Sequence, residues 1–165
     1  TFLSDMSHLC YLKVYNIQTT LYLIIHKALK IPKQFLLLGN KPVLIHTLER
    51  FHTFDPEAQI LITLPADWFS YWENLLADYQ IQIPHQLIDG GQERFHSIQN
   101  ALLYCTGAQI AVHDGVRPLV SIETIERCFA ALGSADAVVP VLPAMAIVGS
   151  AIGGIGGAAA VIAHL

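Results

Sequence analysis

The 165-residue sequence is poor in charge and contains no run of basic residues. Charged residues make up only 13% of it, and 13 acidic residues against nine Lys and Arg give a net charge of −4. Binding of nucleic acid through a phosphate-neutralising patch is therefore not expected. A small anionic ligand remains open, because a few well-placed cations suffice to bind it.

Cysteine is also scarce, and the common zinc and hydrolase motifs are absent. Cys10, Cys105 and Cys128 form no C-x-x-C pair, and their odd number favours free thiols in a reducing cytoplasm. Without H-E-x-x-H or C-x-x-C, a zinc site is not indicated. No G-x-S-x-G turn and no G-x-x-x-x-G-K-[ST] loop occur, so neither a serine hydrolase nor a phosphate-loop protein is indicated.

Neither end of the chain predicts a targeting or membrane segment. The first ten residues lack the positive start and apolar core of a signal peptide, so we expect a cytoplasmic protein. Residues 137–163 carry no charge and are long enough to cross a bilayer. Pro140 and Pro143 interrupt this stretch and its glycines weaken any helix, so no membrane span is expected. We interpret residues 144–165 as a low-complexity apolar tail whose sequence is unreliable or truncated.

Between residues 31 and 143, strand-like and helix-like segments alternate. Apolar residues at helical spacing predict helices after Pro42, Asp67, Gly91 and Ser121, with Asp67 and Ser121 as N-terminal caps. Such alternation is typical of an α/β fold in which helices cover both faces of a mostly parallel sheet, a three-layer αβα arrangement. Strands are expected at residues 59–65, 83–88, 108–114 and 136–143, with a further first strand at residues 19–26.

Glycines and polar residues follow the second of these four strands, where open α/β sheets bind ligands. In GGQERFHSIQNAL (residues 90–102), Gly90 and Gly91 let backbone N–H groups approach a ligand closely. The next helix directs its positive end to the same place, Arg94 lies in its first turn, and Ser97 offers a hydroxyl. The pattern suits a phosphate or nucleotide, but a plain strand–turn–helix joint explains this stretch alone at least as well.

The third strand ends in the sequence HDGVRP. Asp114 is a suitable ligand for Mg²⁺, which takes one or two carboxylates besides substrate phosphates. Gly115 leaves room for a ligand and Arg117 adds a cation, although a surface ion pair between Asp114 and Arg117 is an equally good interpretation. Lys33, in IPKQF, matters only if the fold brings it towards these two segments, because most lysines are simply solvated.

Taken together, three segments are far more specific than each alone. IPKQFLLLGNKPVLIHTLERF (residues 31–51), GGQERFHSIQNAL and VHDGVRPLVS (residues 112–121) resemble, in order and spacing, the 2-C-methyl-D-erythritol 4-phosphate cytidylyltransferase family. The resemblance covers about Ile31 to Pro143. It implies a Rossmann-like nucleotidyltransferase domain over residues 1–143, in a homodimer. It also implies an enzyme of non-mevalonate isoprenoid biosynthesis that joins CTP to the sugar-alcohol phosphate, with Mg²⁺, and releases pyrophosphate.

The resemblance assigns roles to individual residues. It gives Lys33 the catalytic role of stabilising charge on the CTP phosphates, and it makes Asp114 the residue that meets both metal and substrate. The remaining roles are nucleotide binding for Gly90, Gly91, Arg94 and Ser97, and substrate binding for Gly115 and Arg117.

Both ends of the chain depart from the family. The family carries A-A-G-x-G-x-R-M-G before Pro-Lys-Gln, and its glycines cradle the triphosphate, whereas residues 22–34 read YLIIHKALKIPKQ. After Pro143 the sequence has no counterpart of the arm that crosses to the partner. Two alternatives therefore stay open. One is a sibling enzyme for another polyol phosphate such as ribitol phosphate, and the other is a nucleotide-binding relative without catalysis.

Overall fold

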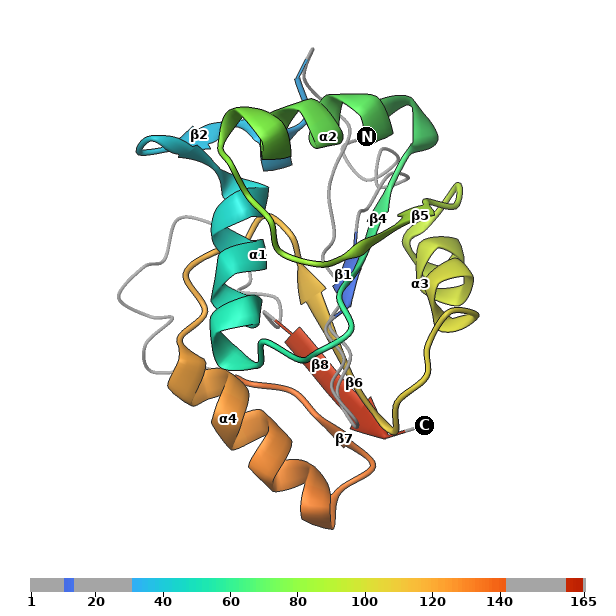
Figure 1. Ribbon diagram of the computed structural model, residues 1–165. Coiled ribbons are helices and arrows are strands. Elements are labelled where there is room, and N and C mark those ends of the chain that lie inside the picture. Colours follow the sequence, from blue (N-terminus) through green and yellow to red (C-terminus); the bar gives the residue numbers. More distant parts are fainter. Residues whose placement is uncertain (1–10, 14–30, 142–159, 165) are drawn as a thin grey trace, which may run out of the picture.

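The computed structural model describes residues 11–13, 31–141 and 160–164 (Figure 1). The strand expected at residues 19–26 lies outside them, as do most of the uncharged stretch 137–163 and the domain boundary expected after Pro143. In the described ranges, no helix is both long and apolar enough to cross a membrane.

A six-stranded sheet forms the centre of the molecule. Its strands, in spatial order, are β5 (Gln86–Asp89), β4 (Leu61–Leu64), β1 (Tyr11–Lys13), β6 (Gln109–Asp114), β8 (Ala160–His164) and β7 (Ala137–Val138). β4 pairs in parallel with β5, whereas β1 and β8 each pair antiparallel with both of their neighbours. Consequently β4, β5, β6 and β7 all run in one direction, and β1 and β8 run against them.

The four strands that share a direction correspond to the four expected from the sequence, which confirms the α/β class and their common orientation. Two differ in extent: β5 begins at Gln86 rather than Ile83, and β7 covers only Ala137–Val138 of the expected 136–143. The two opposed strands are the departure from a purely parallel sheet. Each lies in a gap between two parallel strands, whose facing N–H and C=O groups need partners. An antiparallel segment satisfies these groups at least as well as a parallel one. β8, from the segment interpreted as a tail, thus adds a strand to the same sheet.

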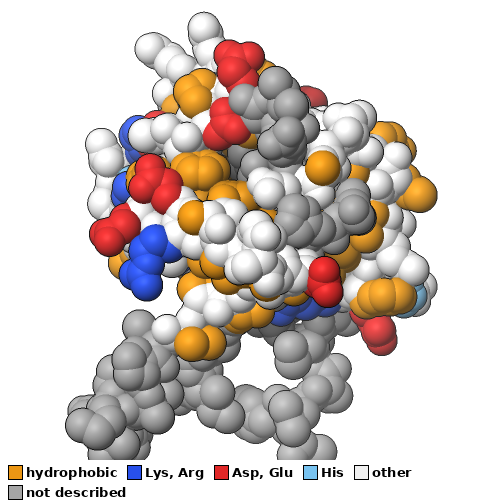
Figure 2. Space-filling view, turned by 90° about the horizontal axis from the view of Figure 1, so that it is seen from below, with side chains coloured by type: hydrophobic (Ala, Val, Ile, Leu, Met, Phe, Trp, Pro, Cys, Tyr) orange, Lys and Arg blue, Asp and Glu red, His pale blue; other side chains and the backbone are white. Residues whose placement is uncertain are grey.

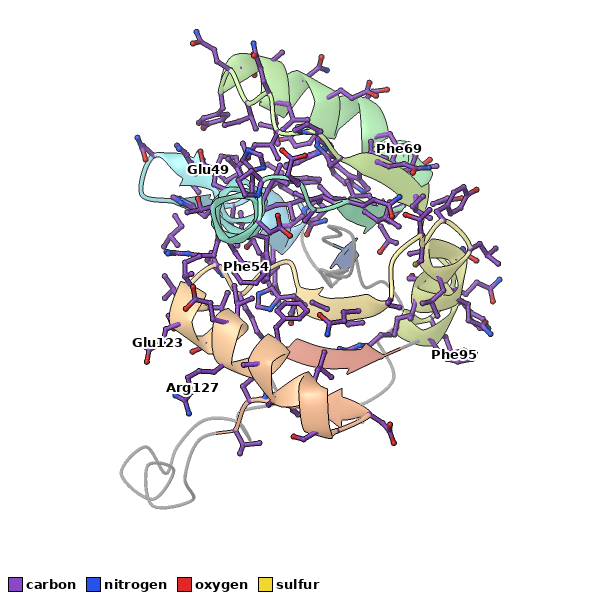
Figure 3. The ribbon with its side chains drawn as sticks, turned by 60° about the horizontal axis from the view of Figure 1, so that its bottom comes forward. Glu49, Phe54, Phe69, Phe95, Glu123 and Arg127 are labelled. Atoms are coloured by element: carbon purple, nitrogen blue, oxygen red, sulfur yellow. The ribbon has the colours of Figure 1, made fainter. Side chains whose placement is uncertain are left out.

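Helices cover both faces of the sheet, as the three-layer prediction requires. α1 (Val43–Phe54), α2 (Phe69–Asp78) and α4 (Ile122–Ala131) lie on one face, and α3 (Arg94–Leu102) lies on the other (Figure 1). Ile62 and Leu64 of β4 belong to the first core and Leu61 to the second, because successive strand residues face opposite sides. Figure 3 shows Phe54 between α1 and α4, where it stacks on Phe129 with ring centroids 5.4 Å apart.

Two of the expected helix starts are confirmed. α1 begins directly after Pro42, and Leu44, Leu48 and Phe51 are buried in the core. α4 begins after Ser121, whose hydroxyl accepts the N–H of Thr124 at 3.1 Å, and it ends in the 3₁₀ turn η3 (Leu132–Ser134). The Ser121 hydroxyl thus satisfies a backbone N–H that the start of a helix otherwise leaves without a partner.

The cap expected at Asp67 is wrong. Residues Ala66–Trp68 form the 3₁₀ turn η2, so α2 starts only at Phe69, and no side chain caps it. Pro65, directly before the turn, has a fixed φ and no N–H, and the tighter turn that follows delays the helix.

A short hairpin precedes α1. Its two strands are β2 (Leu37–Leu38) and β3 (Lys41–Pro42), and the 3₁₀ turn η1 (Lys33–Phe35) precedes it. Gly39 between the two strands has a φ of 66°, a left-handed conformation that glycine adopts without strain. The buried ring of Phe35 contacts those of Trp68 and Tyr71, with centroid distances of 5.4 and 4.9 Å. This packing holds Lys33 beside η2, which follows the carboxyl end of β4.

The face that includes α4 shows how the few charges are spread. In Figure 2, Lys and Arg side chains lie singly among acidic and apolar side chains rather than in a patch. Exposed Glu123 and Arg127 mark the outer side of α4 (Figure 3). The described side chains on this face therefore form no broad positive surface.

Candidate functional site

The candidate site lies where β4, β5 and β6 end. Because these strands run in one direction, the segments that follow them emerge at the same edge of the sheet. Leu64 and Asp89 are register partners at the ends of β4 and β5, and the N–H of Gly90 donates to the carbonyl of Leu64 at 2.9 Å. The Gly90–Gly91 turn and the Asp114 loop are therefore positioned by adjoining parts of one sheet.

The turn before α3 is held tightly by Ser97. The hydroxyl of Ser97 accepts the N–H of Gly91 at 2.9 Å and lies 3.4 Å from the carbonyl of Glu93, to which it donates. Ser97 is fully buried. Its hydroxyl therefore shapes the turn in this structure, and through it the backbone that would face a nucleotide.

Of the two glycines in the turn, only Gly91 occupies a position where any side chain would clash. A Cβ on Gly91 would lie 2.2 Å from the Cβ of His96, far closer than any side chain tolerates. A Cβ on Gly90 would meet the Ser97 hydroxyl at 3.5 Å and the Leu64 carbonyl at 3.6 Å, which are ordinary contacts. Gly91 thus lets the chain pass closely over the start of α3.

The loop after β6 forms a compact turn around Asp114. The N–H of Arg117 donates to the Asp114 carbonyl at 3.0 Å, and the N–H of Val116 donates to Asp114 Oδ1 at 3.2 Å. Arg117 Nε donates to Asp114 Oδ2 at 3.2 Å and forms an ion pair with it. The ion pair considered from the sequence is therefore present, at the end of β6 rather than on an open surface.

The pKa of Asp114 is raised, chiefly because burial disfavours the charged carboxylate. The Val116 N–H, the Arg117 guanidinium and the positive charge of Arg94 all act in the opposite direction and offset the burial only in part. The charge of Arg94 therefore acts on Asp114 across the edge at which the segments after β5 and β6 emerge. A further positive charge at Asp114 would stabilise its ionised form.

Lys33 reaches the same edge by a different route. It is exposed at the start of η1, whose Phe35 packs on η2 beyond the end of β4. No ion pair of Lys33 is present in the described part of the chain. The structure brings Arg94 and Asp114 within electrostatic reach of each other, and it places Lys33 at the same edge without a direct contact to either.

Two further residues organise this edge and were not singled out from the sequence. Asp89 Oδ1 accepts the N–H of Ala66 at 3.1 Å, which ties the turn after β4 to the end of β5. Thr47 Oγ1 on α1 donates to the Gly115 carbonyl at 3.0 Å. In the sequence, Asp89 could have been noticed because it directly precedes Gly90. Thr47 could have been noticed because it is a polar residue within the apolar stripe of α1.

The donor set around Asp114 fits a Mg²⁺ ion that is shared with phosphates. No group of three or more potential metal ligands occurs among the described residues. Mg²⁺ does not need one, because it usually takes one or two carboxylates and fills its other positions with water and substrate oxygens. Among the described residues, Asp114 Oδ1 accepts the Val116 N–H and Oδ2 accepts Arg117 Nε, and the side chain is 21% exposed.

Comparison with known proteins identifies the fold and the family. The family model "2-C-methyl-D-erythritol 4-phosphate cytidylyltransferase" (IspD) matches residues 26–152. The protein of that name from Phocaeicola vulgatus is 46% identical over 113 residues, which are 68% of this chain and 52% of that protein. The ribitol-5-phosphate cytidylyltransferase of Lactiplantibacillus plantarum is 35% identical over 121 residues, 69% of this chain and 52% of that protein.

A solved structure gives the same result. The crystal structure of the 2-C-methyl-D-erythritol 4-phosphate cytidylyltransferase from Thermus thermophilus superposes with a TM-score of 0.55 at 31% identity, over 67% of this chain and 49% of that one. This likeness confirms the Rossmann-like nucleotidyltransferase fold. The chain spans about half the length of the relatives it matches. On the family match over residues 26–152, the chain belongs to the 2-C-methyl-D-erythritol 4-phosphate cytidylyltransferase family.

Proposed function

We propose that this chain is a cytidylyltransferase that joins CTP to 2-C-methyl-D-erythritol 4-phosphate in isoprenoid biosynthesis. The observation that carries the proposal is the ion pair of Arg117 with the largely buried carboxylate of Asp114, on which the charge of Arg94 also acts. The names and identities of the relatives support the substrates.

In the proposed reaction, a phosphate oxygen of the sugar-alcohol phosphate attacks the α-phosphorus of CTP in line. A new P–O bond forms, the bond between the α-phosphorus and the bridging oxygen breaks, and pyrophosphate leaves. Reactions of this type require positioning and charge neutralisation rather than covalent chemistry. Lys33 neutralises charge on the CTP phosphates, and Arg117 and the backbone at Gly115 hold the attacking phosphate.

The nucleotide would lie against the turn before α3. The turn lies at the start of α3, whose positive end favours an anion. The N–H groups of Gly90 and Gly91, expected from the sequence to approach a ligand, bond instead to the Leu64 carbonyl and the Ser97 hydroxyl. Arg94 adds a cation that reaches both this turn and Asp114. Ser97 contributes by fixing the backbone of the turn.

Asp114 is the residue that would hold Mg²⁺. When bound there, the ion would supply positive charge to the phosphate oxygens on which negative charge develops. The same positive charge would offset the burial that raises the pKa of Asp114. We further propose that the protein works as a homodimer in the cytoplasm. The free thiols of Cys105 and Cys128 are compatible with a reducing compartment.

A second substrate is favoured by one specific observation, the 35% identity to a ribitol-5-phosphate cytidylyltransferase. The 46% identity to 2-C-methyl-D-erythritol 4-phosphate enzymes over a similar length favours methylerythritol phosphate instead. Turnover of the purified chain with CTP, Mg²⁺ and a panel of polyol phosphates separates the two. Faster pyrophosphate release with ribitol 5-phosphate would reverse the assignment.

The main experiment measures pyrophosphate release from CTP, methylerythritol phosphate and Mg²⁺. Wild-type protein should release pyrophosphate, and Lys33→Ala and Asp114→Ala should each lower the rate by about 100-fold or more, as loss of a charge-stabilising group does. Lys41→Ala is the control, because Lys41 is engaged with Glu49 at the hairpin. Calorimetry with CTP and Mg²⁺ distinguishes an enzyme from a nucleotide-binding relative without catalysis. Binding of CTP without turnover would identify the latter.

A further inference from the structure

We propose that Thr47 of α1 is a positioning residue, which sets the backbone of the Asp114–Arg117 loop for the proposed reaction. Its hydroxyl donates to the Gly115 carbonyl at 3.0 Å and also lies 3.1 Å from the Val43 carbonyl in its own helix. Thr47 is fully buried, so water does not replace it as a donor. The expected effect of Thr47 on turnover rests on the proposed function, whereas its expected effect on the loop backbone does not.

Packing of the core alone does not explain why a threonine stands at position 47 of α1. It lies on the buried side of α1 among Leu44, Leu48 and Phe51, where valine would fill the same space. Threonine in a helix commonly bonds only the carbonyl four residues earlier. A buried hydroxyl is costly unless its hydrogen bond is used. Here the hydroxyl lies within donating distance of the carbonyl four residues earlier, that of Val43, and also of the Gly115 carbonyl in a loop 68 positions further along the chain.

His113 provides a second anchor on the same side of the loop. Its Nε2 lies 2.9 Å from the Arg117 carbonyl, and because a carbonyl only accepts, Nε2 carries the proton. The His113 ring contacts that of Phe51 on α1, with centroids 4.9 Å apart. α1 therefore supports the loop through Thr47 directly and through Phe51 and His113 indirectly.

The anchors hold the backbone and leave the functional groups accessible. Thr47 and His113 bind the carbonyls of Gly115 and Arg117, while the N–H groups of Val116 and Arg117 bind Asp114. The side chains of Asp114 and Arg117 are 21% and 43% exposed. The backbone is therefore fixed from inside the molecule at alternate residues, and the carboxylate and guanidinium emerge at its edge.

Removing the Thr47 hydroxyl takes its donor from the buried Gly115 carbonyl. The loop should then shift so that this oxygen reaches another donor, and the side chains of Asp114 and Arg117 should move with it. Phosphoryl transfer is sensitive to such shifts, since a displacement of about 1 Å can cost about 100-fold in rate. We expect an effect on turnover without a comparable effect on CTP binding.

The test compares Thr47→Val, which keeps the shape but loses the hydroxyl, with Thr47→Ser, which keeps the hydroxyl. Amide hydrogen exchange at Val116 and Arg117 should be about tenfold faster in Thr47→Val, while the β4 amide of Leu64 stays protected. The kcat should fall by about 10- to 100-fold with an unchanged KM for CTP. Thr47→Ser should restore both readouts. If Thr47→Val does not fold, Thr47→Cys replaces it, because a thiol is a weak donor.

Unchanged exchange at Val116 and Arg117 in Thr47→Val would overturn the proposal, whatever the activity. Faster exchange with an unchanged kcat would overturn the part that concerns the reaction. An inactive wild-type chain would remove the proposed function, and the exchange rates would then still decide whether Thr47 sets the loop.

Discussion

At the scale of a single residue, the carboxylate of Asp114 is buried where its charged form is disfavoured. Burial raises its pKa, and the Val116 N–H and the charges of Arg117 and Arg94 offset this only in part. We expect Asp114→Asn to lower turnover by about 100-fold or more. The midpoint of thermal unfolding at pH 7 should stay the same or rise, because a neutral amide costs less to bury.

The measurement pairs pyrophosphate release with a thermal melt of the metal-free protein. Loss of turnover together with a much lower melting temperature would show that Asp114 supports the fold rather than the reaction. Perturbed carboxylates at a cleft edge are typical of functional sites, and this pair of measurements separates that case from a structural ion pair.

His85 provides a pH-dependent prediction away from the site. Its Nε2 accepts the indole N–H of Trp72 at 2.9 Å, and its Nδ1–H donates to the Ile83 carbonyl at 2.8 Å. Burial lowers the pKa of His85, and the Ile83 bond raises it only in part. The folded state therefore favours the neutral ring, so its stabilising contribution is complete above about pH 6.5 and is lost as the pH falls below that value.

We expect the free energy of unfolding to decrease between pH 7 and pH 5 more steeply in wild type than in His85→Gln. Glutamine can still accept from Trp72 but does not titrate in this range. Urea denaturation at several pH values measures the difference. Equal pH slopes in the two proteins would show that His85 does not contribute.

At the scale of the structural element, the turn between β5 and α3 predicts opposite outcomes for two adjacent glycines. A Cβ at position 91 would lie 2.2 Å from that of His96, whereas a Cβ at position 90 would make only ordinary contacts. We expect Gly91→Ala to destabilise the protein by about 1–3 kcal/mol, as overpacking does. Gly90→Ala should stay within about 1 kcal/mol, since it removes no space that another atom occupies.

Urea denaturation of both variants checks this prediction. Gly91→Ala should also weaken CTP binding, because its N–H bond to Ser97 holds the turn that faces the nucleotide. Equal stability of the two variants would contradict the close passage of the chain over α3.

The start of α4 allows a test of the N-terminal cap that the sequence predicts at Ser121. Ser121 accepts the N–H of Thr124, so Ser121→Ala should cost about 1 kcal/mol of unfolding free energy. Ser134→Ala is the matched control, because Ser134 is exposed and bonds only the Ala131 carbonyl near the end of the same segment. A cost at Ser134 equal to that at Ser121 would argue against a capping role.

These elements show which features the sequence predicts. Apolar runs and helical spacing identify β4, β5, β6 and the four helices, because burial of one face is encoded in local periodicity. The late start of α2 was missed, since the 3₁₀ turn after Pro65 competes with a direct helix start at Asp67. The opposed strands β1 and β8 depend on pairing between distant segments, which no local pattern specifies.

At the scale of the whole molecule, one edge of one sheet collects the residues that the sequence singled out. The charge of Arg94 acts on Asp114 because the segments after β5 and β6 emerge at the same edge, and that much followed from the predicted topology. The internal use of the Ser97 hydroxyl and the support from Thr47 did not follow, because both depend on side-chain contacts formed only in the folded state. The roles of all these residues in binding and turnover stay predictions.

The central claim is that Lys33, the turn at Gly91 and Asp114 form one site for a magnesium–nucleotide complex. Titration of ¹⁵N-labelled protein with CTP and Mg²⁺, followed by NMR, tests it most directly. We expect the amide signals of Lys33, Gly91 and Asp114 to shift together with a single saturation curve, while that of Ile125 on α4 does not shift. Shifts confined to one of the three segments, or three curves with different midpoints, would contradict it.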